Sequence, residues 1–249
     1  MTDRPSVLVP IQVLEGESLP EGTPDLLAKA HVVLLGYHVI PEQTAPGQAR
    51  MQFEEQALSR LKASAELLVE AGATVDHRLV FTHDAQQTID RQIAEYDCTA
   101  ALVPRALASV EDVLVAVRGT VGLDRLAQVV AGLFADGVNV TLYHVKSDDE
   151  TAADVDVLLD GLTDRLGDSD FDTDRVDTRI DHDVGAIDAI AERAKAYDVV
   201  VMGESDPSLS TFVFGMPADQ IAERFLGPVL VVQREPPADP DTTEADDRS

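Results

Sequence analysis

The residues best suited to chemistry lie in VVVMGESDPSLSTFVFGMPADQ, which spans positions 199–220. The residue types predict a buried strand, then a polar loop, and then a helix that begins near Pro217 and Ala218. Glycine lets backbone amides approach a ligand closely, and the first turn of a helix attracts negative charge. The stretch therefore predicts a phosphate-binding site, with the Ser205 hydroxyl as a further hydrogen-bond donor.

Two carboxylates in the same loop oppose this prediction. Glu204 and Asp206 would repel a phosphate group, and they would favour binding only by holding Mg²⁺ between themselves and the ligand. The alternative is a loop that faces solvent on a scaffold that no longer binds a nucleotide. Both alternatives stay open on the sequence.

Further candidates follow from the rule that ligands bind beyond the carboxyl ends of parallel strands, where the strand order switches. Here these ends fall at 117–119, at 145–146 and from 203 onward, and the candidate ligand-binding residues in them are Val117, Arg118, Gly119, Val145 and Gly203. Arg118 and Lys146 are the cations that we expect near a bound phosphate.

Strands and helices alternate in the part of the chain that contains these ends. The predicted strands are 112–117, 138–145, 175–180, 198–203 and 228–233. The predicted helices are 121–137, 151–167, a helix that Asp183 caps and that runs through Ala194, and 217–225. This alternation predicts an α/β fold with a parallel sheet that helices cover on both faces.

The first part of the chain repeats this pattern. Its predicted strands are 6–13, 31–40, 74–81 and 99–104, and its predicted helices are 51–72 and 85–97. Two tripeptides recur at the same offset of 106 positions: Val7-Leu8-Val9 as Val113-Leu114-Val115, and Tyr37-His38-Val39 as Tyr143-His144-Val145. Matches in the same order at one offset predict a duplicated domain, and a duplicated structural role for His38 and His144.

Only 105–111 separates the fourth strand of the first copy from the second copy, which leaves no room for a last helix and strand. We therefore predict two tandem doubly wound parallel-sheet domains, a truncated one at 1–108 and a complete one at 109–235. The second copy, or a second chain, should cover the edge strand at 99–104. The proline- and acid-rich segment 236–249 is predicted to be a disordered acidic tail.

The charge balance excludes some classes of partner. The chain of 249 residues has 19 basic and 46 acidic residues, a net charge of −27, and non-specific binding to nucleic acid or to anionic membranes needs the opposite sign. Only four residues are lysines, which together with the many acids indicates adaptation to concentrated salt. No stretch approaches the roughly 20 apolar residues of a membrane span, so we expect a cytoplasmic protein.

The segment from about 112 to 233 resembles a universal stress protein domain. The resemblance rests on VLVAVRG, LYHV, VVVMG and GMPADQIAERFLGPVLVVQR, and the first half resembles a shortened copy. With its salt-adapted composition, the chain resembles a tandem-domain member of haloarchaeal type. The resemblance implies a fold that binds adenine nucleotides.

Nucleotide-binding members of this family carry Gly, two residues, Gly, nine residues, Gly, and then Ser or Thr. Gly203 matches the first glycine and Gly215 the third, but Asp206 replaces the second and the spacing is one residue short. Met216 stands where the hydroxyl residue would be, and Arg118 where the family usually has an acid. The resemblance thus adds Gly215 and Met216 to the candidate site, beside Ser205, Pro217 and Ala218.

The function that the resemblance implies is regulatory: a stress-response protein that binds ATP or another adenine nucleotide, to which Glu204 and Asp206 would add magnesium. The alternative is a nucleotide-free protein-interaction module that works as a dimer or is accessory to another protein such as a transporter. No serine–histidine–acid or paired-carboxylate arrangement follows from the spacing, and the four histidines other than His38 and His144 are scattered without ligand spacing. We therefore predict neither catalytic turnover nor a metal centre built from protein ligands alone.

Overall fold

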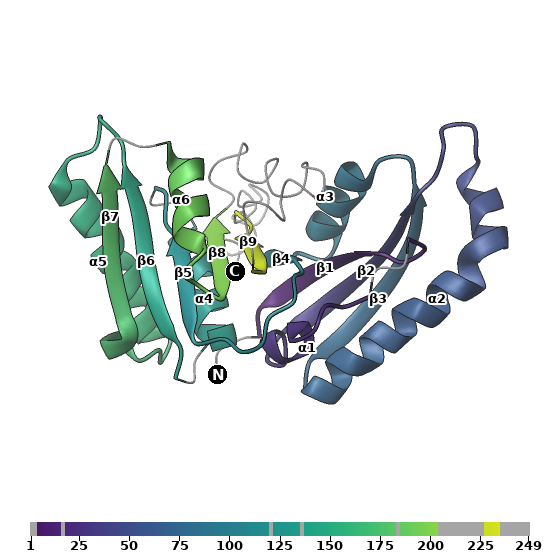
Figure 1. Cartoon of the computed structure of the whole chain (residues 1–249), viewed down its shortest axis with the longest axis horizontal. Coiled ribbons are helices and arrows are strands. Elements are labelled where there is room, and N and C mark those ends of the chain that lie inside the picture. The colour runs from purple at the N-terminus through teal and green to yellow at the C-terminus, as the bar shows by residue number, and fades with distance from the viewer. Residues whose placement is uncertain are drawn as a thin grey trace, which may run out of the picture.

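A computed structural model describes residues 4–15, 18–119, 122–134, 137–182, 185–203 and 227–234 (Figure 1). The strands are β1 Ser6–Gln12, β2 His31–Val39, β3 Thr74–Thr82, β4 Ala100–Val103, β5 Asp112–Ala116, β6 Asn139–Lys146, β7 Val176–His182, β8 Val199–Gly203 and β9 Val229–Val232. The helices are α1 Thr23–Leu26, α2 Pro46–Ala71, α3 Ala85–Glu95, α4 Leu123–Phe134, α5 Ala152–Asp168 and α6 Ala186–Ala194, with a short 3-10 helix at Thr173–Arg175.

All of these strands belong to one sheet, in the order β3-β2-β1-β4-β9-β8-β5-β6-β7. Neighbouring strands are parallel except at one place, where β4 and β9 pair antiparallel. The predicted α/β class with a parallel sheet is confirmed. The two halves are not separate sheets, because β9 continues the sheet of the first half into that of the second (Figure 1).

Each half has the same order of strands. The first half reads β3-β2-β1-β4 and the second half β7-β6-β5-β8, after which the second half alone adds β9. Of the described residues between β4 and β5, none forms a helix or strand. The expectation that the second part of the chain covers the edge at 99–104 is confirmed by the pairing of β4 with β9. That the halves arose by duplication stays a prediction.

Local sequence explains most helix ends. Thr151 and Asp154 form a reciprocal capping box at the start of α5, and Gly72 ends α2 in the left-handed conformation with φ 112°. Pro46 begins α2 five residues earlier than predicted, because proline suits the first helical turn. The predicted cap of α6 is wrong: Gly185 occupies the N-cap, while Asp183 lies outside the described residues.

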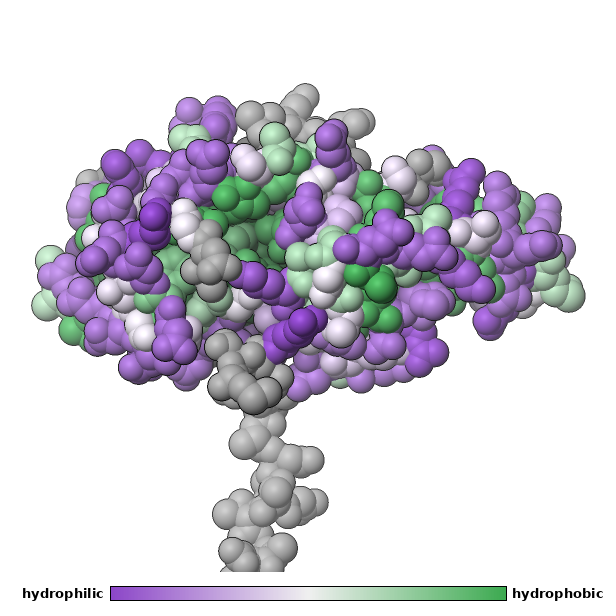
Figure 2. Space-filling model, turned by 90° about the horizontal axis from the view of Figure 1, so that it is seen from below, coloured by the Kyte–Doolittle hydropathy of each residue, from purple (hydrophilic) through white to green (hydrophobic). Residues whose placement is uncertain are grey.

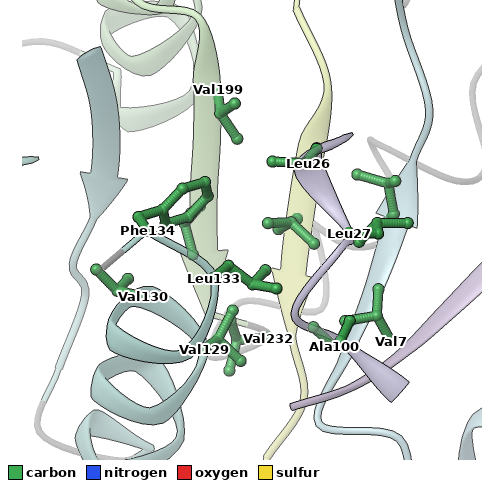
Figure 3. Close-up of a cluster of buried hydrophobic side chains, with 14 of the residues drawn as sticks. Val7, Leu26, Leu27, Ala100, Val129, Val130, Leu133, Phe134, Val199 and Val232 are labelled. Atoms are coloured by element: carbon green, nitrogen blue, oxygen red, sulfur yellow. The ribbon is translucent and has the colours of Figure 1, made fainter. Parts of the chain in front are cut away.

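One hydrophobic core covers a whole face of the sheet across both halves. It joins alternate residues of the strands to α1, α2, α4 and α5. At the junction between the halves, Leu26 and Leu27 lie near Leu133 and Phe134 of α4, close to Val232 of β9 (Figure 3). The halves therefore share a continuous core on this face.

The opposite face carries two smaller clusters. In the first cluster, Ile190, Ala191 and Ala194 of α6 pack on β5, β6, β8 and β9. In the second, Ile89 of α3 packs with Cys98 and with residues of β1, β2 and β4. Seen from below, the surface is largely hydrophilic, with hydrophobic residues gathered in a hollow near its middle (Figure 2). A pocket between the halves is lined mainly by apolar side chains, among them Leu26, Leu107, Val110, Leu133, Phe134 and Val138, and also by Asp25 and Ser109. Among the described residues, no helix has the length and apolar character that crossing a membrane requires.

Candidate functional site

A pocket lies at the carboxyl ends of β5, β6 and β8, beside α6. Its lining residues are Ala116, Val117, Arg118, Tyr143, Val145, Ala186, Ile190 and Gly203. The strand order switches at this point, because the chain passes from β5 to β6 on one side while β8 lies on the other side. Open parallel sheets bind their ligands in such a crevice.

The structure brings together four of the predicted site residues. Val117 and Arg118 follow β5, Val145 is near the end of β6, and Gly203 ends β8, and all four line the pocket. Gly119 is the next residue after Arg118 but does not line the pocket. Its φ of 74° is a left-handed conformation that glycine adopts without strain, and the chain turns there.

The remaining predicted site residues lie outside the described part of the chain. They are Ser205, Gly215, Met216, Pro217 and Ala218, and the same holds for Glu204 and Asp206. The pocket is therefore described from its strand ends and from α6. Lys146 ends β6 and donates from Nζ to the Ser147 carbonyl at 3.2 Å, and it is not a lining residue.

A hydrogen-bonded group of three side chains holds α6 over the pocket. The Tyr143 hydroxyl of β6 donates to Asp181 Oδ2 of β7 at 2.6 Å, and Arg193 Nη2 of α6 donates to the same oxygen at 2.8 Å. The Arg193 guanidinium also lies 5.6 Å from the centre of the Tyr143 ring. These contacts fix the helix that contributes Ala186 and Ile190 to the pocket.

The titration of this group follows from its contacts. Burial, together with the hydrogen bond to the Asp181 carboxylate, raises the pKa of Tyr143 to about 12. Hydrogen bonds from Tyr143 and Arg193 hold the pKa of Asp181 below its ordinary value. The tyrosine therefore stays a neutral donor near neutral pH, and the carboxylate stays charged.

A second polar group lies behind the end of β5. The ring of His144, whose side chain is 1% exposed, contacts the Val117 carbonyl oxygen through Nδ1 at 2.8 Å and Glu150 Oε2 through Nε2 at 3.1 Å. Glu150 also accepts from the backbone N–H and the hydroxyl of Ser147, at 2.8 and 2.7 Å. Burial alone would raise the pKa of Glu150, but the hydrogen bonds from Ser147 and His144 outweigh it and lower the pKa to about 2.

The expectation that His38 and His144 have one duplicated role is not met in their contacts. His38 lies on β2 with its ring edge-on to Phe53 and Phe81, and among the described residues its buried Nδ1 has no hydrogen-bond partner. His144, in contrast, bonds through both ring nitrogens.

Sequence reasoning missed four lining residues, namely Ala116, Tyr143, Ala186 and Ile190. Tyr143 could have been found from strand alternation, because it shares a sheet face with Val145 two residues later. Ile190 was assigned to a helix, but its place over the pocket depends on tertiary packing. Among the described residues, no group of three or more His, Cys, Asp or Glu is arranged to hold a metal ion.

Comparison with solved structures identifies the fold. A universal stress protein from Archaeoglobus fulgidus DSM 4304 matches with a TM-score of 0.58 at 15% identity, over 92% of this chain and 96% of that one. A universal stress protein solved in complex with cAMP matches 51% of this chain and 98% of its own at 20% identity, with a TM-score of 0.38. A putative universal stress protein from Pseudomonas aeruginosa UCBPP-PA14 matches with a TM-score of 0.46 at 15% identity, over 94% of each chain.

No protein-family model and no curated protein sequence matches the chain. The match to the Archaeoglobus protein covers nearly the whole of both chains, so the chain has the fold of a universal stress protein.

Proposed function

We propose that this protein is a regulatory protein of the universal stress protein type, and that it binds an adenine nucleotide at the carboxyl edge of β5, β6 and β8. The observation that carries the proposal is the pocket at the switch in strand order. Residues predicted from three different strand ends line it together. The proposed role is binding and signalling without turnover of the nucleotide.

The lining suits the two ends of such a ligand. Val117, Val145 and Ile190 provide apolar side chains of the kind that pack against a base, while Arg118 provides a cation for a phosphate group. A ligand that is apolar at one end and anionic at the other matches this division.

Magnesium is a separate part of the proposal. Mg²⁺ binds through one or two carboxylates and the oxygens of a phosphate chain rather than in an all-protein cage. The carboxylates that would serve are Glu204 and Asp206, which follow Gly203 directly in sequence and lie outside the described residues. With Mg²⁺ bound between them and a phosphate chain, their charge would favour the ligand, whereas without it their charge would oppose the ligand.

Isothermal titration calorimetry in molar KCl tests the proposal. ATP, ADP and AMP are titrated with and without Mg²⁺, together with cAMP, the ligand of one of the solved universal stress proteins. We expect ATP to bind at micromolar strength or weaker and Arg118→Ala to weaken binding. Arg179→Ala, at an exposed position on β7, is the matched control and should leave the affinity unchanged.

A double variant, Glu204→Gln with Asp206→Gly, separates the remaining possibilities. If the nucleotide binds, this variant should bind it more tightly in the absence of Mg²⁺, because two negative charges are removed. If only the double variant shows heat of binding, the loop once bound a nucleotide and the two carboxylates now prevent it. No heat from either protein would refute nucleotide binding, and the nucleotide-free interaction module would take its place.

A further inference from the structure

The inference concerns His144, which lies behind the candidate site and is not one of its lining residues. Its ring is buried at the end of β6 and contacts two acceptors, the Val117 carbonyl oxygen at 2.8 Å and Glu150 at 3.1 Å. A carbonyl oxygen can only accept, so Nδ1 must carry the hydrogen that makes the bond to Val117. Ser147 holds the Glu150 carboxylate in place, and the carboxylate in turn sets the orientation of the ring.

The bond to Val117 determines the direction of the next amide group. The Val117 N–H donates to the Tyr143 carbonyl at 2.8 Å, so the N–H and the C=O of Val117 both face β6. The described chain has no cis peptide bond, and a planar trans peptide directs its C=O and its N–H to opposite sides. The Arg118 N–H therefore points away from β6, toward the crevice between β5 and β8 where the pocket lies.

The first half uses a different side chain to fix the carbonyl of Val13, which bonds to β2 as Val117 bonds to β6. The Val13 N–H donates to the Tyr37 carbonyl at 3.2 Å, as Val117 does to Tyr143, but the Val13 carbonyl accepts from Arg60 Nη1 of α2 at 2.9 Å. The carbonyl at this point is held in both halves. His38 is not needed for it, which makes His38 a natural control for His144.

We propose that His144 is a positioning residue: by holding the Val117 carbonyl, it orients the Arg118 amide toward a ligand in the pocket. The identity of the ligand, an adenine nucleotide, rests on the proposed function, whereas the orientation of the Arg118 amide does not. The side chain of His144 reaches the pocket lining through its hydrogen bond to the Val117 carbonyl.

Two substitutions separate the two bonds of the ring. The side-chain amide of His144→Asn can replace Nδ1 and donate to Val117, whereas the longer His144→Gln replaces Nε2 and reaches toward Glu150. In calorimetry with ATP in molar KCl, we expect His144→Gln to weaken binding roughly three- to tenfold, the usual effect of one hydrogen bond. His144→Asn should stay within about twofold of the wild type, and His38→Gln should bind like the wild type.

A measurement without ligand keeps this test independent of the proposed function. In ¹H–¹⁵N spectra, the amide signals of Arg118 and Gly119 should shift in His144→Gln and stay in place in His144→Asn and His38→Gln. If the wild type binds no nucleotide, the proposed function fails, and these signals alone judge the role of His144.

The inference would be overturned if His144→Asn and His144→Gln had the same ATP affinity and the same amide signals. It would also be overturned if the Arg118 and Gly119 signals did not move in His144→Gln. If His144→Gln does not fold, Glu150→Ala replaces it. Glu150→Ala removes the partner that orients the His144 ring, so it should shift the Arg118 and Gly119 amide signals, whereas His144→Asn should not. If His144→Asn shifts these signals and Glu150→Ala does not, the inference is also overturned.

Discussion

Ala101 of β4 lies opposite Val231 of β9, in the antiparallel pairing that joins the two halves of the sheet. Both side chains are fully buried, as are Leu102 and Leu230, the pair directly beside them. β9 is thus the fifth strand of the second half and also the neighbour that the first half lacks. We therefore expect the stability of each half to depend on this one strand.

The first prediction concerns the halves expressed separately. A fragment of residues 1–108 loses β9 and should be insoluble or molten, because it exposes β4 as an apolar edge. A fragment of residues 109–235 keeps the order β7-β6-β5-β8-β9 and should fold, but it should self-associate through the uncovered edge of β9. Circular dichroism and size-exclusion chromatography measure both outcomes. A monomeric, well-folded first fragment would contradict this prediction.

The second prediction tests the joint itself. Leu102→Ala and Leu230→Ala should each lower the free energy of unfolding by about 2–5 kcal/mol, because each leaves a cavity in a fully buried site. The double variant should lose less than the sum, since the two side chains face each other across the joint. Leu67→Ala on α2, where the side chain is half-exposed, is the control and should change stability by less than about 0.5 kcal/mol. Urea unfolding in molar KCl measures all four proteins, and strict additivity would argue against direct packing of the pair.

The third prediction concerns salt. The net charge of −27 should make the fold stable in molar KCl and loosen it at low salt. The range over which carboxylates repel one another grows from about 3 Å at 1 M salt to about 30 Å at 0.01 M. The thermal unfolding midpoint should therefore rise as KCl is raised from about 0.01 M to 1 M. A midpoint that is constant across this salt range would refute adaptation to salt.

The fourth prediction follows from the lowered pKa of Glu150, about 2 against an ordinary value of 4.5. A carboxylate with a depressed pKa stabilises the fold above its unfolded-state value, and this stability is lost as the pH falls from about 4.5 to 2. Glu150→Gln should remove a contribution on the order of 1–3 kcal/mol at pH 7 and flatten the loss of stability over that range. Glu66→Gln, an exposed position on α2, should keep the slope of the wild type. Equal slopes in wild type and Glu150→Gln would contradict this prediction.

Much of the fold follows from local sequence. The strands of the second half, the capping box at Thr151 and the glycine that ends α2 are set by residues close to one another in the chain. The rule for parallel sheets also placed Val117, Arg118, Val145 and Gly203 at one edge, because it needs only the ends of the strands.

The direction of β9 relative to β4 could not be predicted in the same way. The alternation of strands and helices predicts β9 parallel to β8, as observed, but its antiparallel pairing with β4 depends on how the two halves meet, because residues 100–103 lie far away in the chain. The roles of Tyr143 and His144 were missed for a similar reason. Their partners Asp181, Arg193 and Val117 come together only when β6, β7, α6 and the end of β5 have assembled.

The central place of β9 has a consequence for synthesis on the ribosome. The ribosome adds about 5–20 residues per second, so β9 emerges roughly 6–25 seconds after β4, its partner in the sheet. During that interval the nascent first half holds an unsatisfied edge, and the hydrophobic residues that meet α4 in the finished core have no cover. The time during which the nascent chain can misassociate is therefore set by the number of residues between β4 and β9. Slower translation of the second half would lengthen this time.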